Sequence, residues 1–210
     1  MQRIPKGVIA GLTVLLVIIA DQTLKIWVKT GMYLGETIEI TSWLKLCFVE
    51  NPGMAFGIEV IGKLFLTLFR IIAVGFIGYY LYQLVKKDFS RGYIVCIALI
   101  LAGAFGNIID CVFYGEIFSQ STSYPDYQVA TFTPVGEGYA TWLHGKVVDM
   151  FYFPLIESRF PSWFPFVGGD SFIFFRPIFN IADSAISVGI ALLILFYRKT
   201  LSGSLQSNEK

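Results

Sequence analysis

Four long apolar stretches dominate the chain, at about residues 8–28, 64–85, 92–113 and 177–197. Each approaches the roughly 20 apolar residues that a helix needs to cross a bilayer. The pattern predicts four transmembrane helices in a single membrane domain covering residues 1–210. The first stretch is longer than the apolar core of a signal peptide and no small-residue cleavage site follows it, so we interpret it as a retained helix.

The segments between the apolar stretches differ in pattern. Residues 31–62 alternate between apolar and polar positions before the turn signal Asn51-Pro52-Gly53, which predicts a small β structure outside the bilayer core. Residues 114–176 form a long loop, in which residues 160–166 look like an aromatic anchor in the headgroup zone. Residues 198–210 are a polar tail. The fold class predicted is therefore an all-α membrane protein with a small β region and a long loop before the last helix.

The basic residues give the orientation of the helices. Half of the 16 Lys and Arg residues lie at the N-terminus, in the connector after the second stretch, or in the tail. They are Arg3, Lys6, Lys86, Lys87, Arg91, Arg198, Lys199 and Lys210. Basic loops favour the cytoplasm, which predicts that both termini lie inside and that the β region and the long loop lie outside.

Five charged residues interrupt the apolar stretches. They are Asp21, Lys25, Arg70, Asp110 and Asp183. At about 1.5 Å of rise per residue, each lies in the outer part of its predicted helix. Ionisable groups inside a membrane are costly and usually functional, so we predict one shared polar site near the outer interface.

Composition agrees with a membrane protein and excludes several kinds of site. The chain is 55% hydrophobic and 15% charged, with a mean hydropathy of +0.66. A net charge of +1 without a basic stripe argues against a nucleic-acid partner. Cys47, Cys96, Cys111 and the single His144 have neither disulfide nor zinc spacing. We expect no metal and no cofactor.

A pair of carboxylates is the chemistry that the sequence favours. Asp149 lies in an apolar run, where burial would raise the pKa of its carboxyl group. Asp183 follows Asn180 by three residues at the start of the last apolar stretch, so we expect the amide and the carboxylate on one helix face. Two close carboxylates share a proton, and one can activate water while the other polarises an amide carbonyl. Asp149 and Asp183 are the predicted catalytic pair.

Structural roles are open for several of these residues. Asp21 is interpreted as structural, paired with Lys25 one turn on. An ion pair with an aspartate is the favoured interpretation of Arg70. The turn at Asn51 is about as well explained by conformation as by function.

Asn107 and Asn180 could join helices by hydrogen bonds without any part in chemistry.

Two functions other than hydrolysis also remain. A small transporter or proton-coupled carrier would use intramembrane Asp and Arg to line a pathway, although we find no internal repeat beyond the short Asn-x-x-Asp pattern. A non-enzymatic assembly factor is the third possibility.

Five short blocks resemble one family in their order along the chain. They are Asp21-Gln22, Asn51-x-Gly53-x-Ala55-Phe56, Gly106-Asn107-x-x-Asp110, Val147-Val148-Asp149 and Phe179-Asn180-x-Ala182-Asp183-Ser184. Together they resemble bacterial lipoprotein signal peptidase (signal peptidase II) from the first span to the fourth. The resemblance implies a monomeric inner-membrane aspartyl protease with a periplasmic β-cradle. Its substrate would be a prolipoprotein carrying a diacylglyceryl group, cut just before the lipidated cysteine, with membrane lipid as its surroundings.

The resemblance also assigns roles to residues. Asp149 and Asp183 match the catalytic dyad, and Asp21 matches a structural carboxylate. The residues that match its supporting or substrate-binding positions are Asn51, Gly53, Asn107, Asp110, Asn180 and Ala182.

Two features depart from the family pattern. Cys111 stands where the family usually has Arg, so Arg176 or Lys146 is expected to supply the missing donor. The loop of residues 114–145 is longer than the family leads us to expect.

Overall fold

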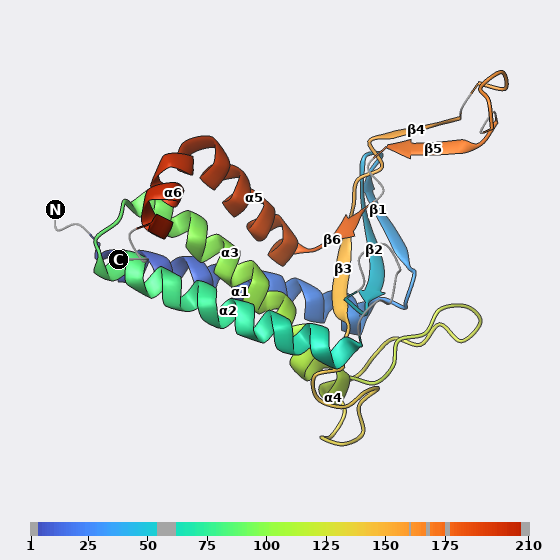
Figure 1. Cartoon of the computed structure of the whole chain (residues 1–210). Coiled ribbons are helices and arrows are strands. Elements are labelled where there is room, and N and C mark those ends of the chain that lie inside the picture. Colours follow the sequence, from blue (N-terminus) through green and yellow to red (C-terminus); the bar gives the residue numbers. More distant parts are fainter. Residues whose placement is uncertain (1–3, 54–61, 160, 167–168, 175–176, 207–210) are drawn as a thin grey trace.

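The computed structural model describes residues 4–53, 62–159, 161–166, 169–174 and 177–206. Four helices make up a bundle: α1 (Lys6–Gly31), α2 (Lys63–Lys86), α3 (Arg91–Ile109) and α5 (Ile181–Phe196). A β-sheet crosses one end of the bundle, and α6 (Arg198–Gln206) and the start of α1 lie at the other end (Figure 1). Predicted residues Ala55, Phe56 and Arg176 lie outside the described residues.

Length and apolar composition identify three helices that could each cross a membrane. They are Lys6–Gly31, Lys63–Lys86 and Arg91–Ile117. The 16 residues of α5 qualify only together with α6, which is bent away from α5 by 92°. The described chain is therefore a helical membrane protein with three or four spans.

Helix α3 is the centre of the bundle and packs against α1, α2 and α5. Glycines allow the closest approaches. A Cβ atom on Gly106 would lie 2.8 Å from the Asp21 Oδ2 atom and 3.3 Å from the Ala182 side chain, and one on Gly103 would overlap the Ala182 carbonyl group. Small residues at such interfaces let helix backbones approach. They bring α1, α3 and α5 together at the end next to the sheet.

The apolar run of α3 extends beyond its α-helical part. The π-helical turn η1 (Asp110–Tyr114) and the short helix α4 (Gly115–Ile117) follow it. Such wide turns inside helices are frequent at functional sites. Here the wide turn contains Asp110, whose side chain is fully buried.

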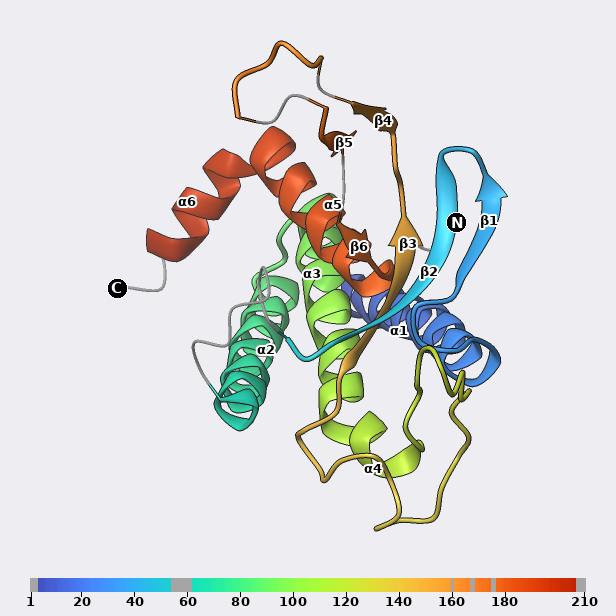
Figure 2. The same cartoon turned by 90° about the vertical axis from the view of Figure 1, so that its right-hand side faces the viewer.

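The sheet has the antiparallel order β1-β2-β3-β6. Its strands are β1 (Thr37–Thr41), β2 (Leu44–Asn51), β3 (Val147–Tyr152) and β6 (Ile178–Phe179). Strand β3 crosses the ends of the helices beside β2, as Figure 2 shows. The separate hairpin of β4 (Ile156–Arg159) and β5 (Ser171–Phe174) projects beyond the sheet.

Four of these strands contradict the sequence-based prediction, which limited the β structure to residues 31–62. Strands β3, β4 and β5 lie in the segment predicted as a loop, and β6 lies in the segment predicted as the last helix. The first four residues of β3 are all buried, so the segment lacks the alternation that identifies a half-exposed strand. The two residues of β6 pair with β3, with Phe179 opposite Phe151, and α5 therefore begins only at Ile181.

The long loop after α4 covers the sheet end of α1. It forms isolated β-bridges between Tyr33 and Val129 and between Phe118 and Phe132. Its aromatic residues pack on a buried cluster that includes Val28 and Phe48. The added loop length therefore extends the hydrophobic core around this end of α1.

Candidate active site

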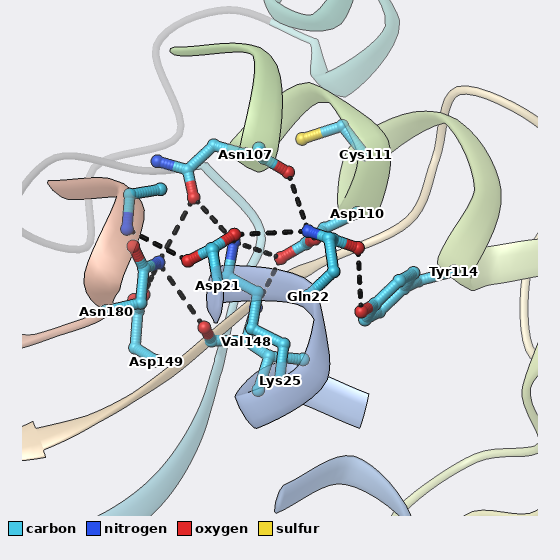
Figure 3. A network of polar contacts seen from close by, with 12 residues as sticks. Asp21, Gln22, Lys25, Asn107, Asp110, Cys111, Tyr114, Val148, Asp149 and Asn180 are labelled. Atoms are coloured by element: carbon cyan, nitrogen blue, oxygen red, sulfur yellow. Dashed lines mark hydrogen bonds and ion pairs between the residues drawn. The ribbon is translucent and has the colours of Figure 1, made fainter. Parts of the chain in front are cut away.

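Asp149 is a buried carboxylate in the middle of the sheet, with 4% of its surface exposed. It lies opposite Val49 of β2, so Asn51, two residues further along β2, belongs to the same face of the sheet. Asn180 Nδ2 donates a hydrogen bond of 2.7 Å to Asp149 Oδ1 (Figure 3).

Asp183 lies in the first turn of α5, directly after the short strand β6. Its backbone N–H donates to Asn180 Oδ1 at 2.9 Å, so Asn180 is the cap of this helix. The prediction that Asn180 and Asp183 share a helix face was therefore wrong, because Asn180 is extended and precedes the helix. The Asp183 carboxylate instead lies in the first turn of α5, at the positive end of the helix dipole.

A second amide connects Asp183 to α3. Asn107 Nδ2 donates to Asp183 Oδ1 at 2.8 Å, and Asn107 Oδ1 accepts from Asn180 Nδ2 at 3.1 Å. Asn180 therefore contacts Asp149 directly. It is connected to Asp183 in two ways, by its own bond to the Asp183 N–H and through Asn107. The two predicted catalytic carboxylates belong to one hydrogen-bond network.

The orientation of each amide in this network is fixed by a neighbour that can only donate. The Asn180 oxygen faces the Asp183 N–H, the Asn51 oxygen faces the Gly53 N–H at 2.8 Å, and the Asn107 oxygen faces the Lys25 ammonium at 2.8 Å. Each amide must therefore turn its NH₂ group the other way. Asn180 and Asn51 donate to Asp149, and Asn107 donates to Asp183.

Lys25 is the only cation among the residues labelled in Figure 3. It is completely buried, and its Nζ atom lies 2.9 Å from Asp21 Oδ2 and 2.8 Å from Asp110 Oδ2. This confirms the pairing expected for Asp21 and Lys25. Gln22 extends the network by donating to Asp110 at 3.0 Å and accepting from the Tyr114 hydroxyl at 3.1 Å.

Both of these aspartates also hold backbone groups of the site. Asp21 Oδ1 accepts from the Ala182 N–H at 2.9 Å and so anchors the first turn of α5. Asp110 Oδ2 accepts from the Val148 N–H at 3.1 Å, next to Asp149 in β3. Ala182 is fully buried against Gly106, where a longer side chain would separate α3 from α5.

Burial raises the pKa of the Asp149 carboxyl group to about 7, and the negative charge of Asp183 acts in the same direction. Hydrogen bonds from Asn180 and Asn51 oppose this rise. Two carboxylates coupled in this way can share one proton near neutral pH.

The site opens into a cavity of about 290 Å³ between α2 and α5. Asn107 and Asp183 line it together with Arg70 of α2, and the remaining lining residues are apolar. The ion pair expected for Arg70 does not form, since within the described part of the chain no carboxylate lies within 4.0 Å of its guanidinium group.

The neighbours of Cys111 differ from those expected. Lys146 pairs with Glu50 at 3.0 Å and therefore points to another partner. Two residues of α2 approach the sulfur instead, Arg70 at 3.4 Å and Lys63 at 3.5 Å. No sequence pattern indicated Lys63, and Lys25 was indicated only as a partner of Asp21, because their contacts join residues far apart in the chain.

Comparison with known proteins identifies the family. The family model described as signal peptidase (SPase) II matches residues 13–198. The chain is 53% identical to a lipoprotein signal peptidase of Porphyromonas gingivalis over 203 residues, covering 96% of this chain and 88% of that protein. It is 37% identical over 202 residues to one from Amoebophilus asiaticus, covering 93% and 80%.

Solved structures give the same relationship. A bacterial membrane enzyme solved by the in meso method at 1.9 Å resolution superposes with a TM-score of 0.57 at 27% identity, covering 89% of this chain and 90% of that chain. The segment matched by the family model contains α2, α3 and α5 in full, the sheet and every residue of the hydrogen-bond network. The chain belongs to the signal peptidase II family.

Proposed function

We propose that this protein removes the signal peptide from diacylglyceryl-modified prolipoproteins by cutting the peptide bond before the lipidated cysteine, with Asp149 and Asp183 as the catalytic pair. Membership of the signal peptidase II family supports the reaction. The observation that carries the mechanism is that oriented amides connect the two carboxylates beside a cavity. The clustering of polar groups at one end of the bundle favours hydrolysis over a transport pathway, which needs polar groups at mid-membrane as well.

The two carboxylates divide the chemistry between them. Ionised Asp183 takes a proton from a water molecule, whose oxygen attacks the scissile carbonyl carbon, while protonated Asp149 gives its proton to the carbonyl oxygen. When the tetrahedral intermediate collapses, the C–N bond breaks and the leaving nitrogen receives the proton from Asp183. Asp149 recovers a proton from the hydroxyl group of the intermediate, which restores the starting state.

The position of the site suits a lipid-anchored substrate. We place both termini in the cytoplasm and the sheet at the periplasmic face of the bacterial inner membrane, with four spans if α5 and α6 count as one. The cavity between α2 and α5 would admit a signal helix from the bilayer while its acyl chains remain in lipid.

The pKa of Asp149 predicts the alkaline limit of the reaction. Since Asp149 must be protonated to act as the acid, we expect kcat in detergent to fall above pH about 7. The measurement is the rate of prolipoprotein cleavage between pH 5 and 9 at saturating substrate. A rate that continues to rise up to pH 9 would contradict this role of Asp149.

The same shift predicts how stability depends on pH. The pKa of Asp149 is raised from 3.8 to about 7, so between these values the folded chain binds more protons than the unfolded chain. The stability from this group is complete below pH about 4 and is lost as the pH rises through 7. We expect the Tm of Asp149→Asn to decrease less than that of the unmodified protein between pH 5 and 8, as measured by thermal unfolding in detergent. Parallel Tm curves would contradict the prediction.

A further inference from the structure

Arg70 and Lys63 form a second polar group in α2, outside the network of the dyad. Both approach the Cys111 sulfur, which is completely buried. A thiol is a weak hydrogen-bond acceptor, whereas a guanidinium group carries five N–H donors. Within the described residues neither cation has a carboxylate partner, so the Cys111 sulfur leaves most of the donors of Arg70 available.

The position of Arg70 connects the cavity with the turn after β2. Gly53 has a φ of +91°, and a Cβ atom there would lie 3.3 Å from Arg70 Nη1 and 2.9 Å from Leu66 Cδ2. The guanidinium group therefore lies against this turn, whose Asn51 contacts Asp149. Arg70 also lines the cavity together with Asp183. A molecule that reaches Asp183 through this cavity passes the guanidinium group of Arg70.

The surroundings of Arg70 select a neutral acceptor over an anion. Asp183 lines the same cavity, and its negative charge would repel a phosphate group. The other lining residues are apolar and favour uncharged groups. A carbonyl oxygen meets both conditions, because it accepts hydrogen bonds from a guanidinium group and carries no net charge.

We propose that Arg70 is a substrate-binding residue that donates hydrogen bonds to carbonyl oxygens of the prolipoprotein near the bond that is cut. The proposal rests on the function proposed above. The carbonyl groups available in that substrate are those of the peptide and the esters of the diacylglyceryl group. The Cys111 sulfur is only a weak contact of the guanidinium group, and Arg70 takes no part in proton transfer.

The test compares KM and kcat for Arg70→Leu, Arg70→Lys and Cys111→Ala on a diacylglyceryl-modified prolipoprotein in detergent. Hydrogen bonds from a charged group predict that Arg70→Leu raises KM about 10- to 100-fold with kcat within about threefold. Arg70→Lys, which keeps the charge, should raise KM severalfold because it loses the planar arrangement of donors. Cys111→Ala removes only the weak acceptor and should leave KM within about threefold of the unmodified enzyme.

Three results would overturn the role of Arg70. The first is an unchanged KM in Arg70→Leu. The second is an equal rise in KM for Cys111→Ala, which would mean that the Arg70 to Cys111 contact is purely structural. The third is inhibition by short-chain phosphatidylglycerol that disappears in Arg70→Leu, which would identify an anionic lipid as the ligand. Thermal unfolding of each variant checks its fold, and Arg70→Lys supplies the KM comparison if Arg70→Leu is unstable.

A second substrate identifies which carbonyl group Arg70 contacts. In a prolipoprotein with ether-linked alkyl chains the lipid has no carbonyl oxygen. If Arg70 binds the esters, this substrate has a raised KM that Arg70→Leu does not raise further. If Arg70 binds the peptide, Arg70→Leu raises KM equally for both substrates. Failure of the unmodified protein to cut any prolipoprotein would reject the proposed function itself, whereas normal cutting with an unchanged KM in the Arg70 variants rejects only this inference.

Discussion

Asn in place of either Asp149 or Asp183 is expected to reduce kcat for prolipoprotein cleavage by about 10³-fold or more. Each change removes a group that transfers a proton in the reaction, and such groups contribute about 10²- to 10⁴-fold each. The effects should not add in the double variant, because the two carboxylates act as a unit. The measurement is cleavage of a lipidated prolipoprotein by purified variants in detergent.

A matched substitution separates this loss from a general effect of removing a carboxylate. Asp126 is exposed in the long loop, so Asp126→Asn should cleave at the rate of the unmodified protein. Both site variants should also unfold cooperatively in thermal scans, because Asn keeps the shape of Asp. Turnover within tenfold of the unmodified rate in either Asp149→Asn or Asp183→Asn would reject the pair.

Lys25→Met is expected to lower the free energy of unfolding by about 3–5 kcal/mol, because it leaves two buried carboxylates without their cation. Asp21 and Asp110 both lie within 3 Å of the Lys25 ammonium group. The change also removes the donor that orients Asn107, whose amide could then turn its oxygen toward Asp183. Activity should therefore fall even at temperatures where the variant remains folded.

A partly exposed lysine provides the control for this prediction. Lys45 pairs with Glu39 at 3.6 Å on the surface of the sheet, where such pairs contribute about 0–1 kcal/mol. Lys45→Met should therefore unfold within about 1 kcal/mol of the unmodified protein and cleave normally. Equal stability and activity in Lys25→Met and Lys45→Met would show that the buried cation does not organise the site.

Composition and periodicity were sufficient to predict the features that depend on residues close together in the chain. The apolar stretches predicted a helical membrane protein, and the Asp21 to Lys25 spacing predicted a pair that the structure contains. The apolar setting of Asp149 correctly indicated a raised pKa. Each of these conclusions depends on residues that are near neighbours in the sequence.

The features that were missed depend on contacts between distant segments. Strand β3 could not be identified because both of its faces are buried, and β6 is too short to show a period. The role of Asn180 as a cap follows from the pairing of β6 with β3, which delays the start of α5. The contacts of Lys25 with Asn107, and of Arg70 with Cys111, cross between helices and leave no pattern within either one.

The most direct test of the account is a crystal structure of the protein with a peptide in which a tetrahedral alcohol replaces the scissile amide. The alcohol carbon imitates the intermediate that water forms between Asp149 and Asp183. We predict that the hydroxyl oxygen lies within about 3 Å of an oxygen of both carboxylates. A hydroxyl group bound to only one of them, with the other more than about 5 Å away, would contradict the shared catalytic role.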